Sequence, residues 1–229
     1  MEKVLEYVAI FLAVIIILTL HEWAHSFAAV RCGDNTPKYS GRLSVNPLRH
    51  FDIIGLLAFV FVGFGWAKPV PINPYNFKKY RSGLALTASA GVIMNYLLAF
   101  IGYPLFVLFL RYVFVSFSDN AFFYLLYCFL FYLVRYNLSF CAFNLIPLPP
   151  LDGFRLVDAV NRRKGRVFQF FRQYGYYILL GLILLNLICE YIPALSVINV
   201  LGYLMTFAQN ILGAPITFFW DRIFGLIYD

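Results

Sequence analysis

The order of apolar and polar positions along the chain is its strongest structural signal. Long apolar runs alternate with short polar segments, and several reach the roughly 20 residues that an α-helix needs to cross a bilayer. The first covers Val4–Leu20 and continues past three polar residues to Val30. This pattern predicts an all-α polytopic membrane protein of about five transmembrane helices. The remaining spans are predicted at Leu84–Leu110, Ala121–Ile146, Tyr176–Ile192 and Val197–Phe219.

One apolar stretch, Asp52–Trp66, is too short for the same interpretation. Its apolar core of about 14 residues is typical of a re-entrant or interfacial segment. Because it is rich in Gly, Phe and Val, we expect a re-entrant β-strand segment, shielded by protein at membrane depth. The Pro-rich segment Lys68–Arg81 that follows is expected to be a loop. We expect one integral membrane domain over residues 1–229, closed by a C-terminal helix pair over 176–219.

Composition excludes an ordinary soluble domain. Hydrophobic residues make up 62% of the chain and charged residues 13%, against about 45–50% and about 25% in typical soluble domains. The four cysteines form no CxxC pair, so a cysteine metal site or a disulfide framework is not expected. The segment 1–6 lacks the positive start of a signal peptide, and we expect it to be retained as part of the first helix.

The net charge of +7 is distributed unevenly. Of the 18 Lys and Arg residues, eight lie within 31–81 and six within 155–172. No nucleic-acid-binding motif accompanies them, so no nucleic-acid partner is expected. The positive-inside rule instead places both basic loops in the cytoplasm, together with Arg222, and leaves only Lys3 and Arg111 outside. We therefore expect an N-terminus outside the cell.

The first span contains the pattern HExxH, formed by His21, Glu22 and His25. Side chains four residues apart share a helix face, so both imidazoles can bind one Zn²⁺ while Glu22 takes a proton from the bound water. Alternatively, these groups snorkel or bond to neighbouring helices. That alternative is weak, because each charged group costs about 2.5–3.5 kcal/mol at the bilayer centre. The pattern therefore predicts a metal site.

Two histidines leave zinc short of a third protein ligand, and the candidate is Asp152. Three prolines between 147 and 150 break the preceding helix near Ile146, which lets Asp152 turn back toward the inner interface. A plain turn acid before Gly153 is the alternative. Asp152 lies on the same side of the membrane as His21 only if the segment 52–66 does not cross.

Three motifs carry a family resemblance: HEWAH at 21–25, NLIPLPPLDG at 144–153 and the GxxxN of Gly91–Asn95. The chain resembles the site-2 proteases, an intramembrane zinc metallopeptidase family, in their short prokaryotic form. With the similar segments 41–55 and 65–77, the resemblance covers about residues 15–155. Val92 stands where the family often carries proline. No PDZ or CBS module fits in 229 residues, so we expect substrate recognition by the membrane core or a separate partner.

The resemblance implies that His21, His25 and Asp152 bind Zn²⁺, that Glu22 is the general base and that Asn144 lies near the scissile carbonyl. It implies hydrolysis of peptide bonds within or near transmembrane segments, with a catalytic core at about 4–155. The expected location is the inner (plasma) membrane, with the active site toward the cytoplasm. The expected partners are a transmembrane protein substrate, the lipid bilayer and a separate adaptor or regulator.

Other polar residues leave alternatives open. His50 and Asp52 could supply a spare ligand, although a histidine in such a loop is more often structural. Asn95 either serves the site or makes an interhelical hydrogen bond beside Gly91. Arg135 lies in the middle of a predicted span, where an arginine normally faces a cavity or a partner. It either binds an acidic substrate segment or pairs with a carboxylate elsewhere in the chain.

Two other function classes compete with a protease. In a transporter, His21, Glu22, His25 and Asp152 would line a proton or cation path, which gives no reason for the HExxH order. In a non-catalytic scaffold of the same fold, the chain would only bind transmembrane helices. The presence of all four metal-site residues argues against this second alternative.

Overall fold

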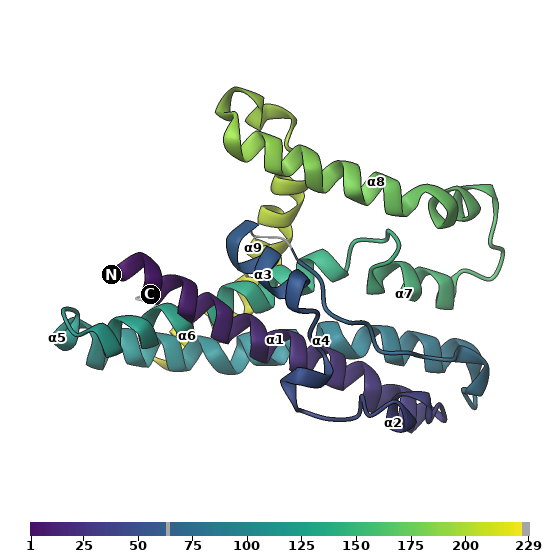
Figure 1. The fold of residues 1–229 in the computed structure, drawn as a ribbon, viewed down its shortest axis with the longest axis horizontal. Helices are drawn as coiled ribbons and strands as arrows, with labels where there is room; N and C mark the ends of the chain where they lie inside the picture. The colour runs from purple at the N-terminus through teal and green to yellow at the C-terminus, as the bar shows by residue number, and fades with distance from the viewer. Residues whose placement is uncertain (63–64, 226–229) are drawn as a thin grey trace.

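The computed structural model describes residues 1–62 and 65–225, and these are almost entirely helical (Figure 1). Four helical segments are long and apolar enough to cross a membrane: α1 (Glu2–Cys32), α4 with its continuation (Tyr80–Phe117), α6 (Ala121–Asn144) and α8 (Arg166–Tyr191). The continuation of α4 (Tyr80–Phe109) is a π-helical turn (Leu110–Phe114) and α5 (Val115–Phe117). Four of the five predicted spans thus correspond to α1, α4, α6 and α8.

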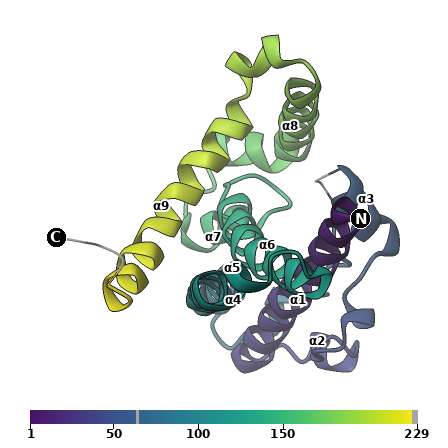
Figure 2. The same cartoon turned by 90° about the vertical axis from the view of Figure 1, so that its left-hand side faces the viewer.

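The helices α1, α4 and α6 form the core of the molecule, packed pairwise against one another (Figures 1 and 2). Small side chains allow this close approach: Ala9 and Ala13 of α1 and Ala99 of α4 are completely buried. α1 ends where Gly33 adopts a left-handed conformation, with φ of 115°, and its N–H bonds back to the last turn. α1, which carries the HExxH pattern, therefore packs against both α4 and α6.

The strands expected over 52–66 are not present; the prediction of extended structure was wrong for the part of this segment that the structure describes. Residues Ile53–Val62 form the helix α3, and a single β-bridge joins Phe51 to Ala67. A helix satisfies its own backbone hydrogen bonds, whereas strands here would need a partner at membrane depth. Ten residues span about 15 Å, too little to cross the bilayer. Residues 63–64 of the predicted segment lie outside the described residues.

α3 packs against the first half of α1 and against α6. Leu56 packs with Ile10, Val14 and Leu18 of α1, and Phe59 contacts Tyr136 of α6 at 5.2 Å between ring centroids. The predicted loop over 68–81 is confirmed in its central part, where the only regular element among described residues is the 3₁₀ turn Pro74–Asn76. Two further short elements precede α3: α2 (Thr36–Tyr39) and the 3₁₀ turn Pro47–Arg49.

After α6 the chain turns into a short helix, α7 (Asp152–Val160), and then enters α8, ten residues earlier than expected. A 3₁₀ segment (Pro193–Ile198) leads to α9 (Val200–Ile223). The count of five spans is not confirmed, because α9 is not among the four helices that qualify. Gln209 and Asn210 lie in its middle and lower its mean hydropathy.

α9 runs obliquely past the α4–α6 pair (Figure 2). It ends against the later half of α4, where Trp220 Nε1 donates to the Phe100 carbonyl at 2.9 Å and Tyr103 Oη donates to Asp221 at 2.8 Å. Arg222 follows Asp221 and therefore lies beside the later half of α4, away from the start of that helix; its place among the cytoplasmic basic loops stays a prediction. A hydropathy pattern gives helix length but not tilt.

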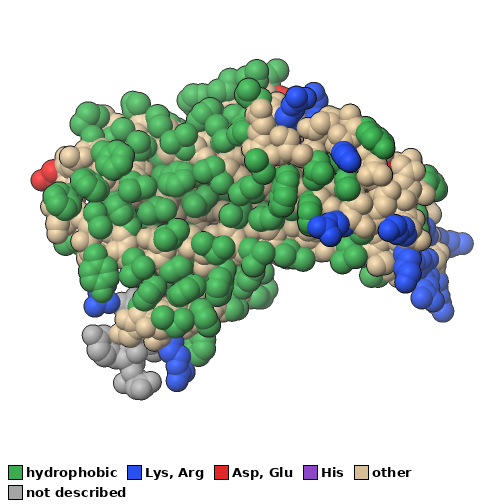
Figure 3. Space-filling view, turned by 90° about the horizontal axis from the view of Figure 1, so that it is seen from below, with side chains coloured by type: hydrophobic (Ala, Val, Ile, Leu, Met, Phe, Trp, Pro, Cys, Tyr) green, Lys and Arg blue, Asp and Glu red, His purple; other side chains and the backbone are tan. Residues whose placement is uncertain are grey.

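Charged and apolar side chains occupy different parts of the surface. Figure 3 shows a broad apolar surface and a concentration of Lys and Arg at one end. That end holds α2, the start of α4 and the connection between α7 and α8 (Figure 1). A cluster of basic residues at one end of an apolar helix bundle is the arrangement that the positive-inside rule predicts.

Candidate metal centre

Two histidines of α1 form one side of the candidate site. His21 and His25 are four residues apart, so they lie one above the other on the same helix face, and their exposed fractions are 4% and 3%. Their ring centroids are 4.6 Å apart. This face points at α4, because a Cβ added to Gly91 would lie 2.5 Å from both His21 Cε1 and His25 Nε2. Only glycine at position 91 leaves room for both rings.

Asp152 reaches the same place from a different part of the chain. It is the first residue of α7, directly after the proline-containing turn that ends α6. The next residue is a glycine because a Cβ on Gly153 would collide with the carbonyl oxygens of Leu145 and Ile146. This close return of α7 onto the end of α6 brings the carboxylate back toward the imidazoles, as the prolines led us to expect.

The three predicted ligands converge. Asp152 Oδ2 lies 3.0 Å from His25 Nε2 and 3.4 Å from His21 Nε2, and the two Nε2 atoms are 3.0 Å apart. All three ligand atoms lie within 4.8 Å of one another, and all three residues are buried. Within the described residues, the structure thus groups the His, His and Asp that the sequence singled out.

The protonation of this group suits a cation. His25 Nδ1 lies 2.7 Å from the Thr87 carbonyl oxygen, which can only accept, so Nδ1 carries the proton and Nε2 presents its lone pair. Asp152 Oδ2 is buried and accepts no hydrogen bond from the described residues. Two imidazole nitrogens and one carboxylate oxygen with a fourth position free are the ligands of catalytic zinc. The residues therefore fit a zinc ion.

Electrostatics keep the Asp152 carboxyl ionised. Burial acts to raise its pKa, but the positive charge of the His25 and His21 imidazoles in their protonated state outweighs that effect and holds the pKa well below its usual range. Arg155 adds a weaker contact, with its Nη1 3.6 Å from Asp152 Oδ1. Arg155 was not predicted from the sequence, although its place three residues after Asp152 on a helix is the spacing of neighbours on one face.

Glu22 and Asn144, the two predicted catalytic residues, are both partly exposed. Glu22 interacts electrostatically with His25, and the described residues offer its carboxylate no hydrogen-bond partner. Asn144 is the last residue of α6, and its Nδ2 donates to the Phe140 carbonyl at 3.1 Å. Their roles stay predictions, since geometry without substrate does not test them.

The structure does not bring the alternative ligands to the centre. His50 is completely buried, with Nε2 2.7 Å from the Ser44 carbonyl oxygen. Asp52 accepts from the backbone N–H groups of Ile54 and Gly55 and so caps α3. Both residues have a structural role in the loop before α3.

Asn95 is also completely buried, one turn after Gly91. Neither its Nδ2 nor its Oδ1 has a partner among the described residues, so the interhelical hydrogen bond considered above is not present. Asn95 is thus a buried polar side chain close to the glycine that faces the imidazoles, with unused hydrogen-bonding capacity.

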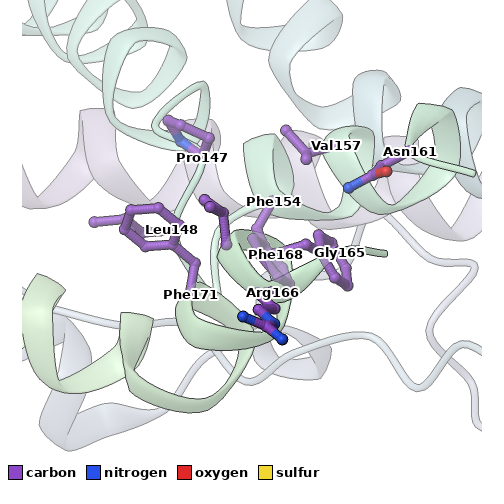
Figure 4. Close-up of a pocket in the computed structure, with 10 residues that line it drawn as sticks. Pro147, Leu148, Phe154, Val157, Asn161, Gly165, Arg166, Phe168 and Phe171 are labelled. Carbon is purple, nitrogen blue, oxygen red and sulfur yellow. The ribbon is translucent and has the colours of Figure 1, made fainter. Parts of the chain in front are cut away.

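A cavity of about 480 Å³ lies beside the turn that carries Asp152 (Figure 4). Phe154 and Phe168, which both line it, stack on each other with ring centroids 5.1 Å apart. Its polar side chains are Asn161 and Arg166, and the rest of its lining is largely apolar, from the end of α6, α7 and the start of α8. An apolar recess therefore adjoins the metal-binding turn on the side of the C-terminal helices.

Comparison with known proteins agrees with this site. The model of Peptidase family M50 matches residues 9–186, which is more than half of the chain. The chain belongs to peptidase family M50. This membership confirms the resemblance to site-2 proteases, and the match extends from the start of α1 through all three predicted ligands into α8. Together with the His, His and Asp donor set, it identifies zinc as the metal of this M50 centre.

A protein of Bacillus subtilis (strain 168) with the name "Putative zinc metalloprotease YwhC" is similar to this M50 chain. The two are 41% identical over 150 residues, which are 64% of this chain and 66% of that protein. The chain thus spans just under two thirds of the length of the curated relative it matches. No solved structure matches it.

Proposed function

We propose that this M50 chain is an intramembrane zinc metalloendopeptidase that hydrolyses peptide bonds within or near the transmembrane segments of membrane proteins. One observation carries the proposal: three buried side chains from α1 and α7 present their ligand atoms within 4.8 Å of one another. One of the two helices, α1, is itself long and apolar enough to cross a membrane. Family membership and the named zinc metalloprotease relative support the same conclusion.

In the proposed mechanism, His21, His25 and Asp152 hold the metal, and the Thr87 carbonyl fixes the orientation of His25. When bound, zinc supplies Lewis-acid polarisation of the scissile carbonyl and a water of lowered pKa. Glu22, next to the ligand His21, would accept a proton from the attacking water as its oxygen bonds to the carbonyl carbon, and would pass that proton to the amine as the C–N bond breaks. Asn144, at the end of α6 beside the turn to Asp152, donates a hydrogen bond near the scissile carbonyl.

The proposed site faces the cytoplasmic half of a plasma membrane. The basic end of the molecule supports this orientation, since it contains the ends of α1 and α4 nearest the metal centre (Figure 3). A cysteine introduced at Lys79, before α4, should resist an impermeant thiol reagent added outside intact cells, whereas one at Asp119, between α5 and α6, should react. The reverse labelling would contradict the orientation. A transmembrane substrate, lipid and a separate adaptor are the proposed partners.

The geometry disfavours a cation path. A path needs polar groups spaced along a route, whereas His21, His25 and Asp152 converge on one point. A scaffold without catalysis would need none of these ligands. The peptidase hypothesis accounts for all of them and for the partly exposed Glu22 between the two histidines.

The decisive experiment compares wild type with Glu22→Gln, reconstituted in vesicles with a panel of transmembrane substrates. The amide occupies the same space but cannot accept the proton, so we expect full zinc content and a loss of cleavage of about 10²–10⁴-fold. Glu190→Gln, at the exposed end of α8, is the matched control and should cleave like wild type. Undiminished cleavage by Glu22→Gln would overturn the mechanism.

A further inference from the structure

A second polar feature lies away from the metal centre, between α4, α6 and α9. It is a groove of about 540 Å³. Three polar side chains line it from two helices: Arg135 of α6 and Gln209 and Asn210 of α9. Tyr103 of α4 and Thr217 of α9 add hydroxyl groups, and the other lining residues are apolar or glycine. None of these polar residues takes part in the proposed peptidase mechanism.

The groove lies deep within the hydrocarbon region. Arg135 is 14 residues from Ala121, the start of α6, and Tyr103 is 14 residues from Phe117, where the span of α4 ends. At 1.5 Å per residue, both side chains start about 21 Å from that end of the bundle. A hydrocarbon core is about 30 Å thick. The depths from two independent helices agree, so the groove is an intramembrane site.

The cation in this groove has no counter-ion among the described residues. Arg135 is exposed, its guanidinium carbon lies 5.8 Å from the centroid of the Phe131 ring, and it interacts electrostatically with the neutral Tyr136. The acid nearest the groove, Asp221, accepts the Tyr103 hydroxyl instead. Gln209 and Asn210 make no side-chain hydrogen bond within the described part of the chain. An arginine at this depth requires a partner.

We propose that this groove binds the transmembrane segment of a protein substrate that carries a carboxylate near the middle of the membrane. A carboxylate pairs with guanidinium through two parallel hydrogen bonds, and the amides of Gln209 and Asn210 can donate to the same group. The assignment of the occupant as substrate rests on the proposed function; the assignment of a carboxylate-bearing helix rests on the groove alone.

Depth and charge exclude the two other occupants. The phosphate of an anionic lipid lies at the interface, outside the hydrocarbon core in which Arg135 lies. A second copy of this chain offers no free carboxylate at this depth among its described residues: Asp221 accepts the Tyr103 hydroxyl, Glu6 accepts the Tyr132 hydroxyl, and Glu22 lies at the metal centre. The remaining occupant for the groove is a transmembrane helix of another protein.

The groove and the metal centre share one helix, since α7, which carries Asp152, and α9 both pack against α4. Arg135 lies nine residues before Asn144, which is about 13 Å along α6. Nine residues make two and a half helical turns, so Arg135 and Asn144 lie on opposite faces of α6. The groove is therefore an anchoring site that holds a substrate helix at a fixed depth, away from the bond that is cleaved.

Binding is tested with the full-length Glu22→Gln protein in phosphatidylcholine vesicles at pH 8. The probes are synthetic transmembrane peptides with a photo-crosslinker, identical except for one central Asp or Asn. Intramembrane polar contacts are worth between about threefold and twentyfold in affinity, and we expect the Asp peptide to bind more tightly by that factor. Arg135→Gln should abolish the preference, and Arg135→Lys should retain part of it.

Two controls make the result specific. Arg111→Gln removes an exposed arginine near the outer end of the bundle and should leave the preference unchanged. Added phosphatidylglycerol should not compete. Equal binding of the Asp and Asn peptides, an undiminished preference in Arg135→Gln, or competition by phosphatidylglycerol would each overturn the groove proposal.

Cleavage by the wild-type enzyme then tests the occupant. The Asp substrate should have a lower KM than the Asn substrate with a similar kcat, and moving the Asp by five residues should remove the difference. If the Asp peptide binds through Arg135 but is cleaved no better, the groove holds a partner helix and the substrate assignment is wrong. If nothing is cleaved while Arg135-dependent binding persists, the proposed peptidase function is wrong, but the proposal that the groove binds a carboxylate-bearing helix is still supported.

Discussion

Two buried carboxylates, Asp34 and Asp152, show how the same side chain serves two purposes in this protein. Both have a pKa lowered below its usual range and both are nearly inaccessible, with exposed fractions of 0% and 5%. The environments differ in what stabilises the charge. Asp34 is surrounded by hydrogen-bond donors, whereas Asp152 is surrounded by the imidazoles of His21 and His25.

Asp34 holds the loop after α1 against the loop before α4. It accepts from the Thr36 backbone and hydroxyl, from the Asn73 N–H at 2.7 Å and from Asn76 Nδ2 at 2.9 Å. Burial acts to raise its pKa, and these donors outweigh that effect. With both oxygens accepting hydrogen bonds from the protein, Asp34 has little left to offer a ligand.

Asp152 Oδ2 has no donor within the described residues and faces the nitrogens of two imidazoles. The comparison teaches that an acid with satisfied oxygens fixes structure, and that an acid whose unsatisfied oxygen converges with other lone pairs binds a cation. Burial alone does not separate the two cases. The following predictions test this distinction, from the largest expected effect to the smallest.

Asp152→Ala should remove the metal and the activity together while the helices remain folded. Loss of one of three protein ligands leaves two imidazoles, so we expect zinc content after dialysis to fall to background and cleavage to fall by about 10³-fold or more. Metal analysis with circular dichroism measures both. Asp158→Ala, on the same helix but paired with Lys164 at 2.8 Å, is the control and should keep its zinc. Unchanged zinc in Asp152→Ala would make another residue the third ligand.

Gly91→Ala should weaken the centre without touching a ligand. The added Cβ would lie 2.5 Å from His25 Nε2, so the ring must rotate or α4 must move away. We expect zinc affinity to fall about 10- to 100-fold, as for other changes in the support of metal ligands. Gly181→Ala in α8, where nothing lies within 4 Å of the new Cβ, should bind zinc like wild type. Equal affinity in both variants would show that the approach of α4 is not needed.

Asp34→Ala should affect stability rather than metal binding. The substitution removes the carboxylate that accepts hydrogen bonds from several donors, and we expect the free energy of unfolding to fall by about 1–3 kcal/mol. Denaturant titration in detergent measures the change, and zinc content of the folded protein should stay at the wild-type level. Loss of zinc with normal stability would reverse the roles that the comparison assigns to the two acids.

The pH dependence of the same variant is a further check. Because folding lowers the pKa of Asp34, its contribution is fully present above the unfolded value of about 3.9 and is lost as pH falls toward the native value. The difference in stability between wild type and Asp34→Ala should therefore shrink below about pH 4. A difference that stayed constant across this range would mean that the charge of Asp34 is not what holds the two loops.

Much of the molecule follows from the sequence alone. Hydropathy predicts α1, α4, α6 and α8, because a helix that crosses lipid must be apolar over most of its length. The HExxH spacing places two imidazoles on one face whatever the surroundings, because helix geometry is local. The prolines after Ile146 predict the turn that returns Asp152, since each acts on the backbone at its own position.

Only the tertiary structure decided the remainder. The apolar composition of residues 53–62 suits either a strand or a helix. Which of the two forms depends on whether another strand is available as a hydrogen-bond partner for the backbone. The tilt of α9, the approach of Gly91 to the imidazoles and the fit of the Thr87 carbonyl to His25 depend on contacts between residues distant in sequence. Tertiary structure also decided that Arg135 has no counter-ion within the described residues. Local periodicity fixes which face a side chain occupies, but packing between helices determines what that face meets.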